Sequence, residues 1–581
     1  MSNVNIKING MALNVPEEFT VLEAARQAHI EIPTLCYLKG INEIGACRIC
    51  VVEVKGARTP LVAACAYPVF EGMEVLTNTK EVQDSRRVTL DLILSNHDRE
   101  CLSCVRNGNC ELQRLCWFFG VETENPYEGE ILDSEFDDST VHMTRDNKKC
   151  ILCRRCSAVC KDEQRVGVIG PNYRGFKTQI GCAFDLNLGE VPCVSCGQCI
   201  VVCPTAAIVE KDQTEEVWAA LNDPQKHVVV QTAPSIRATI GEGFGMPIGT
   251  DATGKMVAAL RRLGFDAVLD TNFGADMTIM EEATEFIHRL EGGENLPLIT
   301  SCSPGWVKYC EHYHPEFVPN LSSCKSPQQM LGAIIKTWYA EQKGIKPEDI
   351  FVVGVMPCTA KKFEVSREDE AAAGVPDCDV ALTTREITRM IKRAGIEFTD
   401  LPDEKFDDLL GNSSGAGIIF GASGGVMEAA LRTAAEWIDG SVGGPIDFTE
   451  VRGMYGVKEA TYRLGGKEFN VAVVSGLRNA EEILEKLKSG EKKYHFIEVM
   501  GCRGGCVNGG GQPIQMGYVR SFIDLKKLRS QVLYSQDKSS QYRRAHHNPQ
   551  VKELYDTWLG SPGSEKAHHI LHTTQKVRES F

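Results

Sequence analysis

The sequence lacks any uninterrupted apolar run of about 18 residues, the length that a membrane-spanning helix requires. It also lacks an excess of basic side chains, because its 63 lysines and arginines are outnumbered by 78 aspartates and glutamates, for a formal net charge of −15. Nucleic acids and anionic lipid surfaces repel such a chain. We therefore expect neither a membrane protein nor a nucleic-acid-binding protein.

A secretion signal is missing as well. Residues 1–7 contain no basic segment followed by an apolar one, which is the pattern of a signal peptide. We therefore predict a cytoplasmic protein. Disulfide bonds are rare in that compartment, so clustered cysteines there more often bind metal.

Cysteine, in contrast, is abundant. Of the 24 cysteines, 17 lie between Cys36 and Cys203, and the other seven are spread from Cys302 to Cys506. A length of 581 residues predicts several domains. The cysteines divide them into a cysteine-rich N-terminal third and a large cysteine-poor body.

The first cysteine set follows a predicted hairpin and helix. Residues 4–15 alternate apolar and polar side chains around Asn9-Gly10, and Thr20 with Glu23 makes a capping box for a helix over 21–28. The spacing C-x10-C-x2-C-x14-C shares its central pair and distant fourth cysteine with plant-type 2Fe–2S ferredoxins, although the first gap is longer. We predict a β-grasp ferredoxin-like domain over 1–80 that binds a 2Fe–2S cluster rather than zinc. Its ligands are Cys36, Cys47, Cys50 and Cys65.

A second set, in a predicted domain over 81–140, has the spacing H-x3-C-x2-C-x5-C. Three thiols and one imidazole fit tetrahedral zinc as well as an iron–sulfur cluster, so the spacing alone favours neither. The ligands would be His97, Cys101, Cys104 and Cys110.

A third region, over 141–212, repeats the run C-x2-C-x2-C-x3-C. This is the pattern of bacterial two-cluster ferredoxins, in which the fourth cysteine of each run binds the other cluster. One predicted 4Fe–4S cluster is bound by Cys150, Cys153, Cys156 and Cys203. The other is bound by Cys193, Cys196, Cys199 and Cys160.

Residues 213–581 alternate apolar runs with helical patterns, which predicts an α/β body with a parallel sheet and a C-terminal helical segment. The expected strands cover 228–233, 266–269, 296–301, 350–355, 417–420, 470–474 and 496–500. Ligands of such sheets bind at the carboxyl ends of the strands. Cys302, Cys358 and Cys502 each follow one of these strands.

The last of these strands leads into a stretch where eight of the eleven residues from Gly501 to Gly511 are glycine or cysteine. Glycine permits close approach of backbone to a bulky ligand, and thiolates prefer zinc or iron–sulfur. A structural zinc loop is the simpler reading. The four cluster sites upstream instead indicate a chain of electron carriers, and such a chain requires a redox reaction at its buried end.

Three motifs in the body carry a family resemblance. They are Thr300-Ser-Cys-Ser-Pro-Gly-Trp306, Met356-Pro-Cys-Thr-Ala-Lys-Lys-Phe-Glu364 and Glu498-Val-Met-Gly-Cys-Arg-Gly-Gly-Cys-Val-Asn-Gly509. They resemble the signatures TSCCPxW, MPCxxKxxE and ExMxCxxGCxxG of the iron-only (FeFe) hydrogenases. The resemblance covers essentially the whole chain and is closest to catalytic subunits of NAD(P)-linked, electron-bifurcating multi-subunit hydrogenases.

The resemblance implies an H-cluster, in which a 4Fe–4S cube is joined to a two-iron unit with CO, CN⁻ and a bridging dithiolate. Cys358, Cys502 and Cys506 match cube ligands, Cys506 being the bridge to the two-iron unit. The resemblance also places a 4Fe–4S cluster on the His97 set. The expected cofactors are thus one 2Fe–2S cluster, three 4Fe–4S clusters and the H-cluster.

One position departs from the family pattern. The family has two adjacent cysteines where this chain has Cys302 and Ser303. Direct alignment puts Ser303 on the fourth cube ligand and Cys302 on the cysteine that passes protons. Serine is a harder donor than thiolate, so the opposite assignment stays open.

Other residues match family positions singly. Lys361 matches a lysine that contacts a cyanide, although a surface lysine is the usual case. The residues that match the lining of the pocket are Ala233, Pro234, Ser235, Gln328, Met356, Phe420, Gly421 and Met500. The matched proton path is Arg289, Glu285, Ser322, Glu282 and Cys302. Without the family, a helix face with Glu282, Glu285 and Arg289 would be read as solvated.

The implied reaction is 2H⁺ + 2e⁻ ⇌ H₂. No flavin or nucleotide motif is present, so any use of NAD(P) requires flavin- and NAD(P)-binding partner subunits, with ferredoxin as a further electron partner. The alternatives are a non-catalytic electron-transfer subunit of an NADH dehydrogenase and an H₂-sensing or iron–sulfur assembly protein. A dehydrogenase subunit would not require Cys358, Cys502 and Cys506.

Overall fold

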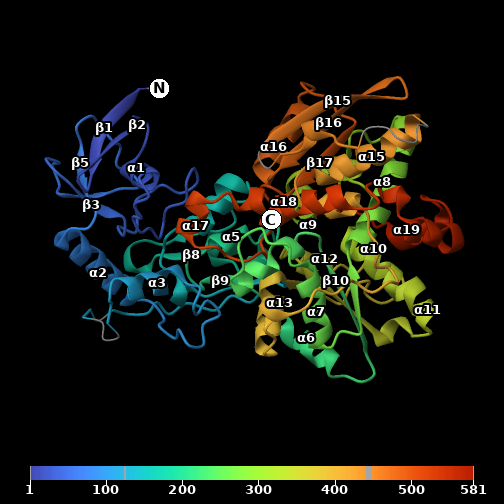
Figure 1. The fold of residues 1–581 in the computed structure, drawn as a ribbon, viewed down its shortest axis with the longest axis horizontal. Coiled ribbons are helices and arrows are strands. Elements are labelled where there is room, and N and C mark those ends of the chain that lie inside the picture. The colour runs from blue at the N-terminus through green and yellow to red at the C-terminus, as the bar shows by residue number, and fades with distance from the viewer. Residues whose placement is uncertain (1, 123–125, 128, 440–445, 454–455, 580–581) are drawn as a thin grey trace.

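The computed structural model describes residues 2–122, 126–127, 129–439, 446–453 and 456–579. Figure 1 shows an N-terminal module, a central region of short elements and a large body. The C-terminal helices run along the body and reach back toward the N-terminal module (Figure 1).

The N-terminal module is built on a five-stranded sheet in the order β2-β1-β5-β3-β4. The predicted hairpin is formed by β1 (Asn3–Ile8) and β2 (Met11–Pro16), and alternate residues of β1 are buried. The sheet is completed by β3 (Val51–Val54), β4 (Leu61–Ala63) and β5 (Glu74–Leu76). The predicted helix is α1 (Val21–Gln27), and it begins with the expected capping box of Thr20 and Glu23.

The central region consists of short helices and strands joined by the cysteine-bearing loops. Its helices are α2 (Lys80–Leu94), α3 (Glu111–Phe118), α4 (Arg155–Ala158) and α5 (Gln198–Val202). Two antiparallel pairs complete it, β6 (Met143–Arg145) with β9 (Ile208–Glu210) and β7 (Gly170–Asn172) with β8 (Gln179–Gly181).

The body contains two four-stranded sheets rather than one. The first is fully parallel, in the order β11-β10-β13-β14, with β10 (His227–Thr232), β11 (Ala267–Asp270), β13 (Ile350–Met356) and β14 (Val380–Thr383). The second has the order β12-β17-β16-β15, with β12 (Leu298–Ile299), β15 (Val457–Leu464), β16 (Lys467–Ser475) and β17 (Phe496–Met500). Only β15 is antiparallel to its neighbour, so the prediction of an α/β body with parallel strands is confirmed.

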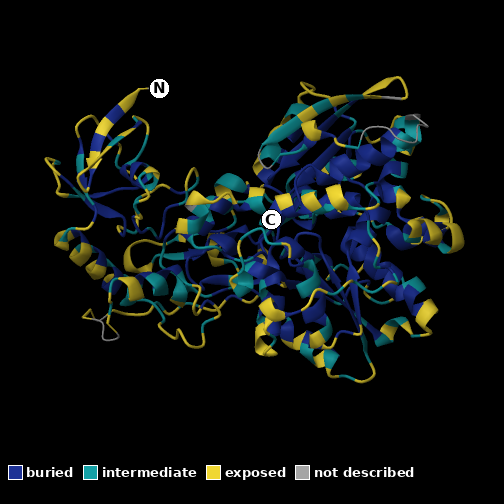
Figure 2. Ribbon diagram, in the orientation of Figure 1, coloured by how far each residue is buried: buried dark blue, intermediate teal, exposed yellow. Residues whose placement is uncertain are grey.

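Helices cover both faces of each sheet. They are α6 (Thr214–Leu221), α7 (Thr253–Leu263), α8 (Asn272–Gly292), α9 (Pro304–Tyr313), α10 (Pro327–Ile334), α11 (Ala340–Lys343), α12 (Ala360–Glu364), α13 (Thr384–Arg393), α14 (Gly415–Ile419), α15 (Gly425–Asp439) and α16 (Leu477–Lys488). Figure 2 shows that the interior between them is almost wholly buried.

Helix α8 is shared by the two halves of the body. Its Phe273 and Met277 pack in the core of the first sheet, whereas Ile279 and Phe286 pack in the core of the second. A helix that is apolar on opposite sides must be buried on both. The polar residues of α8 near its middle are therefore held deep inside the protein.

One predicted strand is wrong. Residues 417–420 belong to and directly follow α14, whose first turn is capped by the Ser414 hydroxyl accepting from the N–H groups of Ala416 and Gly417. A short buried apolar run does not distinguish a strand from a helix by periodicity, and the capping serine decides the outcome here.

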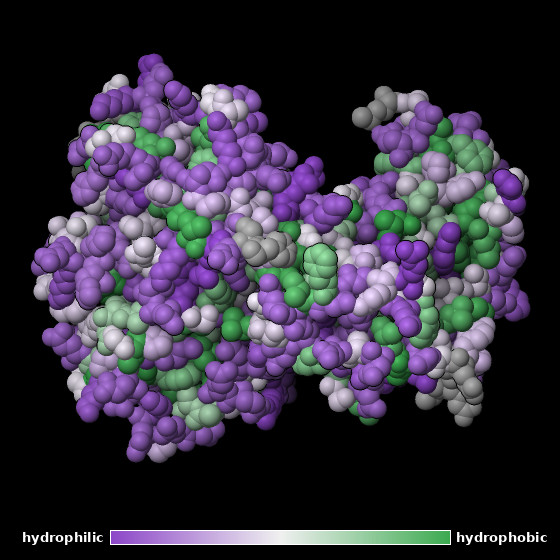
Figure 3. Space-filling model, turned by 180° about the vertical axis from the view of Figure 1, so that it is seen from behind, coloured by the Kyte–Doolittle hydropathy of each residue, from purple (hydrophilic) through white to green (hydrophobic). Residues whose placement is uncertain are grey.

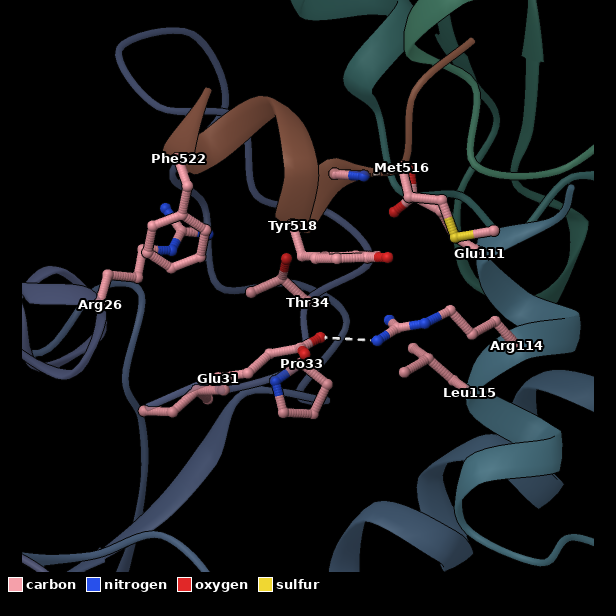
Figure 4. Close-up of a pocket in the computed structure, with 12 residues that line it drawn as sticks. Arg26, Glu31, Pro33, Thr34, Glu111, Arg114, Leu115, Met516, Tyr518 and Phe522 are labelled. Carbon is pink, nitrogen blue, oxygen red and sulfur yellow. Dashed lines mark hydrogen bonds and ion pairs between the residues drawn. The ribbon is translucent and has the colours of Figure 1, made fainter. Parts of the chain in front are cut away.

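The C-terminal segment consists of α17 (Gly517–Phe522), α18 (Leu525–Ser539), α19 (Pro549–Leu554) and α20 (Glu565–Leu571). In the pocket drawn in Figure 4, α17 meets both the N-terminal module and α3. Arg114 donates to Glu31 at 2.9 Å and lies under the Tyr518 ring at 4.2 Å. The C-terminal segment therefore ties the cysteine-rich third to the body.

The surface seen from behind is mostly hydrophilic, with a notch between the body and the N-terminal module (Figure 3). Among the described residues, no helix is both long and apolar enough to span a membrane.

Candidate functional site

A cavity lies where strands of both sheets end. Its empty volume, counted together with the space at its opening, is about 700 Å³. Ala233 follows β10, Thr271 follows β11, and Cys302, Cys358 and Cys502 come just after β12, β13 and β17. The carboxyl ends of five parallel strands thus meet at one place, which is where open α/β sheets bind ligands.

Three thiols converge on this cavity, those of Cys358, Cys502 and Cys506. Burial raises the pKa of all three, to about 12 for Cys506, and neighbouring thiols raise the pKa of Cys502 and Cys506 further. Thiolates gathered in so dry a place need cationic charge to hold them in that form. Iron supplies that charge, so this donor set fits a cube of iron and sulfur.

Cys302 and Ser303 occupy different surroundings, although both line the cavity. Burial, and then the Glu282 carboxyl, raise the pKa of the Cys302 thiol well above its ordinary value. Ser303 is the residue before α9, and its Oγ accepts a hydrogen bond from the Gly501 N–H at 3.2 Å. Cys302 thus lies toward Glu282, whereas Ser303 lies against the segment that carries Cys502.

A buried cation lies at the wall of the cavity. Lys361 Nζ donates to Ser326 Oγ at 2.8 Å and to Glu364 at 2.8 and 3.0 Å. Gln328 also lines the cavity, and its Oε1 has no hydrogen-bond partner among the described residues. The Lys361 ammonium in an otherwise apolar wall fits a ligand with hydrogen-bond acceptor groups, such as the diatomic ligands of a two-iron unit.

The rest of the predicted lining falls into two groups. Residues that line the cavity are Ala233, Pro234, Gln328, Met356, Phe420 and Met500. Ser235 and Gly421 instead pack together behind this wall, and Ser235 Oγ accepts from Gln512 Nε2 at 3.2 Å. A side chain at Gly421 would meet Leu533 and Ser235, so this glycine is needed for packing rather than for contact with a ligand.

The predicted proton path is continuous over its outer half. Arg289 donates to Glu285 at 2.6 Å, and Ser322 Oγ donates to the other oxygen of Glu285 at 2.8 Å. Arg289 and Glu285 are both partly exposed, with 14% of each side chain accessible, so this end reaches solvent.

The inner half of the path consists of Glu282 and Cys302. Glu282 is buried, and neither carboxylate oxygen makes a hydrogen bond of normal geometry within the described part of the chain, although the Ser322 hydroxyl is near enough to influence it. Burial, followed by the charge of Glu285, raises the pKa of Glu282 to about 8. A carboxyl with such a pKa can both accept and release a proton near neutral pH.

The N-terminal cysteines are also brought together. The thiols of Cys36 and Cys47, and those of Cys50 and Cys65, lie close enough to shift each other's pKa. Within the third region, one cavity is lined by Cys150, Cys153, Cys156 and Cys203. The Cys199 thiol is influenced by the charges of Cys196, Cys193 and Cys160, so the fourth cysteine of each run lies with the other run.

The His97 set lies nearer the surface, and Cys101 is exposed. Burial lowers the pKa of His97 to about 4, which keeps the imidazole neutral. Its Nδ1 is buried and has no hydrogen-bond partner among the residues that the structure describes. A neutral imidazole with a free ring nitrogen fits a metal ligand.

Sequence reasoning missed the residue that connects these sites. Gln198 on α5 lies between Cys196 and Cys199 in the sequence, and its Nε2 donates to Cys502 Sγ at 3.2 Å and to Asn508 O at 2.9 Å. The Cys196 thiol is also close enough to raise the pKa of Cys502. No local signal marks Gln198, because its partner is 304 residues away in the sequence.

Sequence reasoning also missed the role of Glu498. Its buried carboxylate accepts from the Gly424 and Met427 N–H groups, both at 2.7 Å, at the start of α15. The sequence feature that could have identified this role is the position of Glu498 at the start of the third motif. It anchors β17, and with it Cys502, to the helix layer.

Models of five protein families match successive parts of the chain. They are a 2Fe-2S iron-sulfur cluster binding domain (1–80), an NADH-ubiquinone oxidoreductase-G iron-sulfur binding region (86–125), a 4Fe-4S dicluster domain (136–212), the iron only hydrogenase large subunit, C-terminal domain (226–510), and the iron hydrogenase small subunit (523–578).

Curated proteins and solved structures agree with these matches. The chain is 49% identical to the NADP-reducing hydrogenase subunit HndD of Solidesulfovibrio fructosivorans, over 99% of each chain. It is 44% identical to iron hydrogenase 1 of Clostridium pasteurianum, over 98% of this chain and 99% of that one. The structure of FeFe-hydrogenase HydA1 from Chlamydomonas reinhardtii superimposes with a TM-score of 0.56 and 40% identity, over 63% of this chain and 99% of that one. The predicted fold class is thereby confirmed.

Proposed function

Because the chain belongs to the iron-only (FeFe) hydrogenases, we propose specific roles for its residues in the reversible formation of H₂. The protein is the catalytic subunit of a hydrogenase, with iron–sulfur cluster domains preceding the H-cluster domain. The observation that carries the proposal is the single cavity on which three buried thiols, the Lys361 ammonium and Cys302 all converge.

In this proposal Cys358, Cys502 and Cys506 hold the cube, and Ser303 occupies the fourth position beside it. When bound, the H-cluster supplies the two-electron redox chemistry that joins or separates protons and electrons. Lys361 would orient its polar ligands, and Gln328, Met356, Met500 and Phe420 would line the cavity and exclude water from it.

Protons reach the cavity through Arg289, Glu285, Ser322, Glu282 and Cys302. The outer three are joined by hydrogen bonds, and Glu282 stands between them and Cys302. Its raised pKa lets Glu282 carry the proton across the part of the route that has no exposed group. We assign the last transfer to Cys302 because its thiol faces Glu282 and the cavity.

The four ligand sets given above would hold one 2Fe–2S and three 4Fe–4S clusters, which would supply electron transfer to and from the cavity. The contact between Gln198 and Cys502 makes the Cys193, Cys196, Cys199 and Cys160 cluster the neighbour of the cube. Because HndD is named as a subunit of an NADP-reducing hydrogenase, we propose that partner subunits with flavin and NAD(P), or ferredoxin, exchange electrons with this chain.

The alternative function, a non-catalytic subunit of an NADH dehydrogenase, would explain the family match over residues 86–125. It does not account for a dry cavity with three thiols at the carboxyl ends of five strands. A sensor or assembly protein would share the cavity, and turnover of H₂ distinguishes it from an enzyme.

The test is a pair of variants in the matured, anaerobic enzyme. Cys302→Ala should keep a full iron content and lower the rate of H₂ formation by about 10²- to 10⁴-fold, because only the proton relay is lost. Ser303→Cys should keep both iron and turnover and raise the reduction potential of the cube, since a thiolate stabilises oxidised iron less than an alkoxide does. Cys310→Ala, a buried cysteine outside the cavity, is the matched control.

Loss of the cube iron in Cys302→Ala, with iron kept but turnover lost in a Ser303→Ala enzyme, would reverse the two assignments.

A further inference from the structure

Two histidines and a glutamate gather at a seam in the body, far in sequence from any motif described above. Glu436 lies in the last turn of α15, and His546 and His547 lie in the single helical turn Ala545–His547 that precedes α19. One ligand atom from each of the three residues lies within 4.8 Å of the other two. We propose that they bind a divalent cation of the zinc type.

The distances between these atoms match the edges of a zinc site. His547 Nε2 lies 3.1 Å from Glu436 Oε1, and His546 Nε2 lies 3.4 Å from Glu436 Oε2. Ligands about 2.0 Å from a tetrahedral zinc ion are about 3.3 Å from one another. The two imidazoles therefore flank the carboxylate, one beside each of its oxygens, at about the spacing that a shared ion requires.

The ring of His546 is oriented for this role. Its Nδ1 lies 3.1 Å from the Thr433 hydroxyl, which directs Nε2 toward Glu436. The side chain is only 10% exposed, and Nε2 has no hydrogen-bond partner among the described residues. A ligating histidine characteristically makes a hydrogen bond with its second nitrogen, as His546 does with Thr433.

The protonation states are also suitable. Burial lowers the pKa of His546 to about 4, so its Nε2 lone pair is available at neutral pH. The His547, His546 and Arg544 side chains lower the pKa of Glu436 against the opposing effect of its own burial, so it is a carboxylate.

A salt bridge alone is the competing explanation, because Arg544 Nε lies 3.1 Å from Glu436 Oε2. That contact neutralises the carboxylate and accounts for its burial. It does not account for the imidazole of His546, whose Nε2 points at the same carboxylate without a hydrogen bond. In the proposed site Arg544 remains beside Oε2, and its positive charge makes binding weaker than in a thiolate site.

The proposed site lies between two segments of the chain that match different families. Glu436 lies within the match to the large-subunit domain (226–510), and both histidines lie within the match to the small subunit (523–578). An ion held by all three would fasten the small-subunit-like segment to α15. This proposal is independent of the catalytic roles given above, since none of the three residues lines the H-cluster cavity.

The experiment uses the full chain with its clusters loaded, so that cysteines are occupied by iron. The protein is incubated anaerobically with one equivalent of Zn²⁺ and desalted, and zinc and iron are measured by mass spectrometry together with the zinc K-edge absorption spectrum. We expect about one zinc per chain, with only nitrogen and oxygen neighbours at about 2.0–2.1 Å.

His547→Ala and Glu436→Gln should each lose this zinc while iron content and H₂ turnover stay unchanged. The control His569→Ala, at an exposed histidine elsewhere in the C-terminal segment, should keep it. Zinc that does not survive desalting, zinc with sulfur neighbours at about 2.3 Å, or equal zinc in His547→Ala and the parent protein would each overturn the proposal.

Discussion

The cysteine-rich third and the body bind metal by different means. In the cysteine-rich third, three ligands of each 4Fe–4S cluster come from one short run such as Cys193 to Cys199, and only the fourth comes from the other run. The helices beside these runs have only four or five residues. In the body, the ligands Cys358, Cys502 and Cys506 are brought together by strand ends of two sheets that are far apart in the sequence. The comparison indicates that electron carriers need only local spacing, whereas the catalytic cavity needs the whole fold.

The largest expected effect separates the two kinds of site directly. Cys506→Ala should reduce H₂ turnover to background, because the cavity loses the thiolate proposed to join the cube to the two-iron unit. The paramagnetic signals of the N-terminal clusters should be unchanged. Cys47→Ser should do the opposite, losing the 2Fe–2S signal while the enzyme still evolves H₂ from an artificial reductant.

The next effect concerns the buried carboxyl of α8. Glu282→Gln should lower turnover by about 10²- to 10⁴-fold, because the amide cannot carry a proton between Ser322 and Cys302. Glu291→Gln, at an exposed position on the same helix, is the control and should have no effect. Full activity in Glu282→Gln would exclude this route.

The same variant should change how stability depends on pH. Because burial raises the pKa of Glu282 from 4.5 to about 8, the folded protein binds this proton more tightly than the unfolded chain does. Between these values the unfolded state has released the proton, so the contribution of Glu282 to stability falls as pH rises. Chemical denaturation should show the parent protein losing stability relative to Glu282→Gln between about pH 5 and pH 8.

A smaller effect is expected where the two regions meet. Gln198→Leu removes the hydrogen bond to Cys502 Sγ, which stabilises the reduced and more negative cube. We expect a lower reduction potential for the cube in a redox titration, and a modest fall in turnover. An unchanged potential would mean that the contact is structural only.

The smallest effect is local to the N-terminal module. Thr20→Ala removes the cap of α1 and should cost about 1 kcal/mol in the thermal unfolding of that module, followed through its 2Fe–2S absorption. Thr20→Ser keeps the hydroxyl and should be close to the parent protein. H₂ turnover should be the same in both variants.

The comparison also explains what the sequence could and could not predict. Hairpin, capping box and cysteine runs are local, so the N-terminal elements and their grouping followed from spacing and turn residues. The strands β10, β13 and β17 were recognisable as buried apolar runs, but their division between two sheets was not. The run 417–420 was misread because Ser414, rather than hydrophobic periodicity, sets the local structure.

Within the site, the residues of the three motifs and singly matched positions such as Gln328 and Phe420 were found through resemblance, whereas some other residues were not. Gln198 and Thr271 contact the site or line it only because distant segments pack there. Ser235 and Gly421 were placed on the lining, yet they support it from behind, which depends on side-chain packing that a sequence pattern does not record.

Infrared spectroscopy of the anaerobically matured protein tests the central claim most directly. If the cavity at the strand ends holds the H-cluster, bands of CO and CN⁻ ligands should appear, and they should be absent from Cys506→Ala. Protein with its full complement of N-terminal clusters but without these bands, and without H₂ formation from a strong reductant, would contradict the account.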